Sequence, residues 1–159
     1  MIKQYSTHVA AVGGCATIVS ASKKFAEPLV LGVALQLLKT LARNNDNSVS
    51  LHDAGVCELV IKNLASNIEF LRQQAMSCFV SLCSIGDLNI LRLFGLGGFD
   101  LVIDQMTKNV SDQYYLYTCS LALECMFSYS DILQRMIALN VKSVLLLIKK
   151  VIISFIHLF

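Results

Sequence analysis

The sequence has one proline, no tryptophan and only eight glycines among its 159 residues. A chain rich in β-strands needs many turn residues, so this scarcity favours helices. Charged residues make up 15% of the chain and hydrophobic residues 55%, a balance that excludes a disordered chain. The 13 basic and 11 acidic residues are spread out without a basic run, so the charge gives no support for a nucleic-acid partner.

Metal-binding and secretory signals are also missing. No two cysteines form a C-x-x-C pair and the three histidines do not cluster with them, so we expect no metal site and no cofactor. The opening "MIKQYSTHVAAVGG" is polar where a secretory signal would be apolar, which argues against a secreted disulfide framework. We expect buried thiols in a reducing compartment at Cys15, Cys57, Cys78, Cys83, Cys119 and Cys125.

Catalytic motifs are absent as well: there is no P-loop, no G-x-S-x-G, no H-E-x-x-H and no pair of catalytic carboxylates. "GLGG" at 95–98 is a weak match to a dinucleotide fingerprint, because no predicted strand precedes it. "NVS" at Asn109 matches a glycosylation sequon, which acts only in the secretory pathway. We predict that the chain is not an enzyme. A thiol enzyme or redox sensor is the alternative that the cysteines leave open.

What the sequence does contain is a repeat of 42 residues. Gly13, Gly55 and Gly97 follow one another at this spacing, and the next step reaches Leu139, beside Asn140. Around Gly55, "SLHDAGVCELVIKNLAS" indicates a short helix, a glycine and a second helix. A left-handed residue ends a helix most easily when it has no Cβ. We therefore predict that these glycines end the first helix of each copy, and that Asn140, which tolerates the conformation, does so in the fourth.

Each copy is predicted to hold three helices. In the second copy we expect them at about 46–54, 56–65 and 68–84. The copies form a single domain over residues 1–159, and they cover approximately 1–44, 45–86, 87–130 and an incomplete 131–159.

Apolar stripes and capping residues support this division. Pro28 suits the start of the third helix in the first copy, and Asp87 and Ser111 are candidate N-caps in the third. The second helices repeat an i, i+3, i+4, i+7 stripe at Cys15, Ile18, Val19 and Ser22; Cys57, Val60, Ile61 and Leu64; Phe99, Val102, Ile103 and Met106; and Val141, Val144, Leu145 and Ile148. The inward positions of the third helices are Ala34, Leu35, Leu38 and Leu41; Ala75, Met76, Phe79 and Leu82; and Leu121, Ala122, Leu123 and Met126.

The stretch "SLHDAGVCELVIKNLASNIEFLRQQAMSCFVSLCS" resembles the armadillo repeat family, in its "AG" turn and in the small, hydrophobic start of its third helix at "QAMSCFVSL". The resemblance covers almost the whole chain. It implies an all-α fold, a right-handed armadillo-like superhelix of about three and a half three-helix repeats, whose third helices line a concave groove.

The resemblance also implies where a partner would bind. Family members bind extended protein segments in the groove, often through asparagines and a tryptophan on successive third helices. In this chain Thr40, Ser81 and Cys125 stand at the asparagine position, and Gln36, Ser77 and Leu121 stand at the tryptophan position. Such small, weakly polar side chains suit a close-packed helix or subunit better than an extended backbone. The candidate groove residues are Gln36, Lys39, Thr40, Arg43, Arg72, Ser77 and Ser81.

The last residues, "SVLLLIKKVIISFIHLF", are apolar except for two lysines that leave nine residues after them, whereas a membrane span needs about 20. We interpret this stretch as the second helix of the incomplete fourth copy. Its candidate docking face holds Lys149, Lys150, Ile153, Phe155 and Phe159. Because an incomplete copy exposes an apolar face, we predict that the protein is a subunit of a larger assembly.

Together these features favour a non-catalytic scaffold or adaptor that binds protein partners. We expect it inside the cell, in the cytoplasm, with a cytoskeletal or ciliary assembly as one setting. The alternative is a peripheral membrane protein that is anchored through the apolar C-terminal helix.

Overall fold

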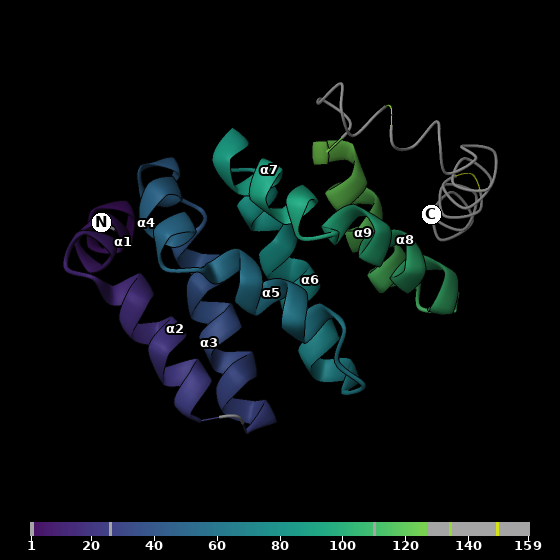
Figure 1. Cartoon of the computed structure of the whole chain (residues 1–159), viewed down its shortest axis with the longest axis horizontal. Coiled ribbons are helices and arrows are strands. Elements are labelled where there is room, and N and C mark those ends of the chain that lie inside the picture. The colour runs from purple at the N-terminus through teal and green to yellow at the C-terminus, as the bar shows by residue number, and fades with distance from the viewer. Residues whose placement is uncertain (1, 26, 110, 127–133, 135–148, 150–159) are drawn as a thin grey trace. The chain divides into compact units, whose positions relative to one another are not determined.

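The computed structural model describes residues 2–25, 27–109 and 111–126, together with Gln134 and Lys149. Within these residues the regular elements are nine α-helices and one short 3₁₀ helix, without a strand (Figure 1). The prediction of an all-α fold is confirmed, whereas the superhelix, its hand and the single domain stay predictions. The chain divides into two compact units, Met1–Leu96 and Gly97–Phe159.

The helices follow the predicted order of a first, a second and a third helix. In the first unit they are α1 (Ile2–Ala11), α2 (Gly14–Lys24), α3 (Pro28–Leu41), η1 (Asn45–Asn47), α4 (Ser48–Asp53), α5 (Val56–Leu64), α6 (Glu69–Cys83) and α7 (Asp87–Gly95). In the second unit they are α8 (Gly98–Lys108) and α9 (Gln113–Met126).

The predicted boundaries of the second copy are confirmed to within two residues. The helix expected at 46–54 is formed by η1 and α4, and those at 56–65 and 68–84 are α5 and α6. Pro28 is the first residue of α3, where its missing N–H breaks no helical hydrogen bond.

Both predicted N-caps are off by one residue. Asp87 is the first residue of α7, and Gly86 takes the N-cap position. α9 is capped by Asp112, whose Oδ1 accepts a hydrogen bond from the N–H of Tyr115 at 2.9 Å. Ser111 and Asp112 are both good capping residues, so the sequence pattern alone does not separate them.

The three spaced glycines share one conformation. Gly13, Gly55 and Gly97 have φ values of 81°, 76° and 78°, and each directly precedes a second helix. A Cβ at Gly13 or Gly97 would meet no atom within 4 Å, so glycine is needed there for its backbone conformation and not for space. The predicted left-handed turn is therefore confirmed at these three positions. Asn140 lies outside the described residues.

The predicted apolar stripes form the core of the described part. Their members there are buried, except for the half-buried Ile18, Ile61, Ile103 and Leu121. Ser22, the polar exception, is also buried, and its hydroxyl donates to the carbonyl of Ile18 at 2.8 Å. A buried hydroxyl with a backbone partner avoids the cost of desolvation without a hydrogen bond.

α6 is central to the core of the first unit because it packs against both α3 and α5 (Figure 1). Leu38 of α3 and Met76 and Phe79 of α6 are fully buried. Gly32 of α3 lies against Phe70 of α6, and a Cβ there would lie 2.2 Å from Cε1 of Phe70. The absence of a side chain at Gly32 lets the Phe70 ring lie against the backbone of α3.

Two buried asparagines join consecutive first helices in the first unit. Asn47 donates from Nδ2 to the carbonyl of Ser6 at 3.4 Å, and Asn89 donates to the carbonyl of Ser48 at 3.2 Å. Each asparagine is 41 residues after its serine, so the same bond recurs one repeat further along the chain.

The second unit has its own core in the described residues. α8 packs against α9, and both helices contribute fully buried large side chains, namely Phe99, Met106, Leu123 and Met126.

Candidate functional site

α3 carries apolar residues on two faces. Leu35 and Leu38 are buried against the rest of the first unit, but Leu29, Val33 and Leu37 are exposed to 70%, 49% and 51%. These three residues follow one another at i, i+4 and i+8, so they form a line along the outer side of α3, which we call the α3 stripe. The outer side of a helix in a soluble domain is normally polar, so the α3 stripe is a candidate binding surface.

A hollow of about 280 Å³ adjoins the C-terminal end of the α3 stripe. It is lined by Val33, Gln36, Leu37, Lys39, Thr40 and Arg43. The structure thus brings together four of the predicted groove residues, Gln36, Lys39, Thr40 and Arg43. Leu29, Val33 and Leu37 are not among the residues predicted from the sequence to bind a partner, although "PLVLGVALQLL" is apolar on nearly every side of the helix.

The two cations of the hollow have no partner within the described part of the chain. Lys39 is half-buried and Arg43 is exposed, and neither side chain forms an ion pair or a hydrogen bond with another described residue. The hollow therefore combines an apolar wall with two uncompensated positive charges.

The hydroxyl groups of Thr40 and Ser81, two of the residues compared with asparagine in the sequence, already have partners. The hydroxyl of Thr40 donates to the carbonyl of Gln36 at 2.9 Å, and that of Ser81 donates to the carbonyl of Ser77 at 3.2 Å. Both bonds lie within one helix. These donors are therefore occupied within their own helices and are not directed at a partner backbone.

The other three predicted groove residues belong to α6, which packs beside α3. Arg72, Ser77 and Ser81 are half-buried there and do not line the hollow. Nη1 of Arg72 donates to the carbonyl of Ser66 at 3.0 Å, so the guanidinium is tied to the loop before α6. Arg72 is thereby less available to a partner than Lys39 and Arg43.

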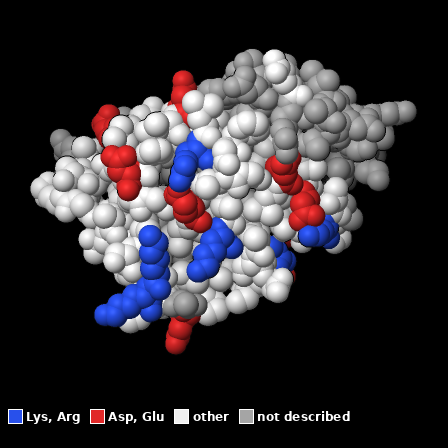
Figure 2. All heavy atoms as spheres, viewed as in Figure 1, with Lys and Arg blue, Asp and Glu red and all other residues white. Residues whose placement is uncertain are grey.

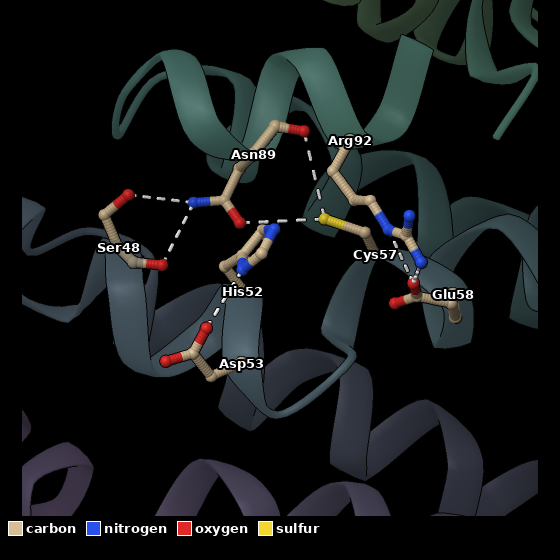
Figure 3. Close-up of polar contacts among 7 residues, drawn as sticks. All are labelled: Ser48, His52, Asp53, Cys57, Glu58, Asn89 and Arg92. Atoms are coloured by element: carbon tan, nitrogen blue, oxygen red, sulfur yellow. Dashed lines mark hydrogen bonds and ion pairs between the residues drawn. The ribbon is translucent and has the colours of Figure 1, made fainter. Parts of the chain in front are cut away.

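A polar cluster joins α4, α5 and α7 (Figure 3). Asn89 of α7 is fully buried, and its Nδ2 donates to Oγ of Ser48 at 2.9 Å as well as to the carbonyl of the same residue. Its Oδ1 accepts from the thiol of Cys57 at 3.6 Å. The amide is thus satisfied on both sides, and it fixes α7 on α4 and α5.

At the surface of this cluster, Nε of Arg92 donates to Oε1 of Glu58 at 2.7 Å, and Nη2 of Arg92 contacts the same oxygen. Partial burial by itself raises the pKa of Glu58. This effect is outweighed by the hydrogen bond and charge of Arg92, by a backbone hydrogen bond and by the charge of His52, so the pKa of Glu58 is lowered overall. His52 pairs with Asp53 at 3.1 Å. Each charged group has a neighbour of opposite sign. We therefore interpret the cluster as one that holds α4, α5 and α7 together.

The thiols are in the core. Five of the six cysteines are buried, Cys125 is half-buried, and none is in a disulfide. Burial raises the pKa of Cys57, Cys78 and Cys119 to about 12. Near Cys57 the carboxylate of Glu58 raises the pKa further, and Arg92 only partly opposes this. The thiolate is the nucleophilic form, so these cysteines are poor nucleophiles at neutral pH.

A second hollow, of about 450 Å³, lies on α2 between Ala16 and Phe25. Small side chains and Lys24 line most of it, and Nζ of Lys24 lies 5.4 Å from the centre of the Phe25 ring. Figure 2 shows basic and acidic side chains interspersed over the face in view, so the charge of that face does not indicate a partner.

Of the predicted C-terminal docking face, the structure describes only Lys149, which is exposed. Lys150, Ile153, Phe155 and Phe159 lie outside the described residues. Among the helices that are described, none has both the length and the apolar character to cross a membrane. The described residues also contain no group of three or more His, Cys, Asp or Glu side chains that could hold a metal ion.

Comparison of the chain with protein-family models, curated proteins and solved structures found no match. The interpretation of the α3 stripe and its hollow therefore depends on their own geometry and charge.

Proposed function

We propose that this protein is a non-catalytic, armadillo-like scaffold that binds a protein partner through the α3 stripe and the adjoining hollow. The exposure of Leu29, Val33 and Leu37 on a helix whose opposite face is already buried carries this proposal. Burying a fully exposed apolar side chain is worth about 1.5–3 kcal/mol, and because Val33 and Leu37 are only 49% and 51% exposed, covering each of them gives a partner roughly half of that.

The recurrence of structural details at the repeat spacing supports the armadillo-like part of the proposal. The left-handed glycines and the buried asparagine bonds return after 42 residues, as expected for stacked copies of one helical triplet. Stacked copies place successive third helices side by side, and α3 and α6 have this arrangement in the first unit. We propose further that the protein acts as a subunit of a cytoplasmic assembly.

Two substitutions of the same chemistry test the use of this surface. Leu37→Asp places a carboxylate in the α3 stripe, while Val49→Asp does so on α4, where the side chain is 60% exposed and outside the hollow. The full chain carrying either change should keep its helical circular dichroism, because neither residue is in the core.

We expect partner proteins that co-purify with the unmodified chain from its native cells to bind the Leu37→Asp chain at least about tenfold more weakly, because a carboxylate cannot be buried there without cost. The Val49→Asp chain should retain them. Equal retention by both variants would show that the partner binds elsewhere.

A further inference from the structure

From the charge and the hydrogen bonds of this surface we infer the class of its partner: an amphipathic helix that packs its apolar side on the α3 stripe and places acidic residues on Lys39 and Arg43. This inference rests on the proposed binding function of α3. It adds the secondary structure of the partner and the sign and position of its charge.

The side chains of this surface offer few free hydrogen-bonding groups, which favours a helical partner over an extended peptide. An extended peptide needs partners for its backbone N–H and C=O groups, whereas a helix satisfies these groups internally. Leu29, Val33 and Leu37 offer no polar atom, and the hydroxyl of Thr40 already donates to its own helix. The hollow is lined by two neutral polar side chains, Gln36 and Thr40, and of these only the amide of Gln36 is not hydrogen-bonded to its own helix.

The spacing of the α3 stripe also fits a helix. Ridges at i and i+4 pack into the grooves of a second helix that carries apolar residues at the same spacing. Such a helix would cover the outer side of α3 in the way that α6 covers its inner side.

The charge of the hollow gives the sign of the partner. Lys39 and Arg43 form no ion pair with a described acidic residue, so an approaching carboxylate meets two cations that have no ion-pair partner in the described part of the chain. Both side chains line the same hollow as Val33 and Leu37. A partner that fills the hollow therefore contacts apolar and basic groups together, and a basic partner would be repelled.

The distance between the apolar and basic parts gives the position of that charge. Lys39 is six residues after Val33 on one helix, which corresponds to about 9 Å along the helix axis. The acidic residues of the partner helix should accordingly lie nearly two turns from the apolar side chain that packs on Val33.

A library of displayed peptides tests this inference on the full chain. Each peptide is an alanine-based helix with leucines at i, i+4 and i+8, and two positions beyond each end of that line are varied between Glu, Gln and Lys. The library is sorted for binding to the unmodified chain. The enriched peptides are then measured against three full-length variants: Lys39→Glu with Arg43→Glu, Lys23→Glu with Lys24→Glu, and Leu37→Asp.

We expect enriched peptides to carry Glu at one end of the apolar line, to bind the Lys39/Arg43 variant at least tenfold more weakly, and to bind the Lys23/Lys24 variant within threefold of the unmodified chain. The Lys23/Lys24 variant has the same change in net charge, so it controls for long-range electrostatics. The Lys39/Arg43 variant should prefer peptides with Lys at that end. This reversed preference shows that the variant is folded, because an unfolded chain would not select a charge pattern.

Other outcomes separate the two proposals. If peptides are enriched that lose binding to Leu37→Asp but show no preference for Glu, the α3 stripe binds partners and the acidic-helix inference is wrong. If enrichment fails, or if no enriched peptide depends on Leu37, the acidic-helix inference is wrong. The comparison of Leu37→Asp with Val49→Asp then decides separately whether the α3 stripe binds a partner.

Discussion

Gly95 and Gly97 are two residues apart, and a Cβ would find open space at either one. They differ in backbone conformation, since Gly95 is the last residue of α7 whereas Gly97 has a φ of 78°. Residue type at such positions is therefore decided by dihedral angles and not by packing.

This difference predicts opposite effects for the same substitution. Gly97→Ala should lower the free energy of unfolding by about 1–2 kcal/mol, because a Cβ is disfavoured in the left-handed region. Gly95→Ala should change it by less than about 1 kcal/mol, in the stabilising direction, because alanine is the better helix former. Urea titration of the full chain followed by circular dichroism measures both, and equal losses would show that the conformation at Gly97 is not what constrains the residue.

The polar cluster predicts that a buried amide matters more than an exposed ion pair. Asn89→Ala removes the donor to the half-buried Ser48 and the acceptor of the buried Cys57 thiol, which should cost about 1–3 kcal/mol. Arg92→Ala breaks the ion pair with Glu58, of which both side chains are partly exposed, and should cost less than about 1 kcal/mol. The same urea titrations compare the two, and a larger loss for Arg92→Ala would contradict this ranking.

Among the helices, α9 is capped at its N-terminus by the side chain of Asp112. The carboxylate of Asp112 accepts the N–H of Tyr115 in the first turn of the helix, where N–H groups lie too early to reach a carbonyl four residues before them.

Removal of the Asp112 cap should destabilise the start of α9. Asp112→Ala is expected to cost about 1 kcal/mol, and to increase hydrogen exchange in the first turn of α9. Ser111→Ala, one residue earlier, should have little effect on either quantity. If Ser111→Ala produced the larger change, the serine would be the cap, as the sequence pattern allowed.

Elements were predictable where a residue type has a direct backbone consequence. Gly55 and Pro28 mark a helix end and a helix start, and the structure confirms both. The outer face of α3 was not predictable in this way. Leu29 and Leu37 are the same residue type as Leu35 and Leu38, and periodicity cannot tell which of two apolar faces the fold will cover. The positions of Gln36, Lys39, Thr40 and Arg43 in one hollow followed from helical spacing once the third helix was identified.

For the whole molecule, the buried thiols couple stability to alkaline pH. In the unfolded chain a cysteine ionises near pH 8.5, whereas burial raises the pKa of Cys57, Cys78 and Cys119 to about 12 in the folded chain. Between these values the folded chain holds more protons than the unfolded chain. The free energy of unfolding must therefore fall as the pH rises from about 8.5 towards about 12.

Each of these thiols should contribute about 1.4 kcal/mol per pH unit to that slope. Cys57→Ala should make the slope shallower by this amount, in titrations with urea at pH 8, 9.5 and 10.5 under reducing conditions. Val60→Ala is the matched control, since Val60 is equally buried on α5 and has no ionisable group. It should lower stability equally at all three pH values, and an unchanged slope for Cys57→Ala would show that the thiol ionises while folded.

The asparagine bonds between first helices have a consequence for how such a chain can grow. A second copy of residues 45–86, inserted in frame after residue 86, would bring its own donor for the carbonyl of Ser48 and its own acceptor for Asn89. No interior amide would be left without its counterpart. Adding whole repeats therefore leaves these asparagine hydrogen bonds intact. Gene duplication could lengthen the chain in this way without a compensating substitution at these contacts.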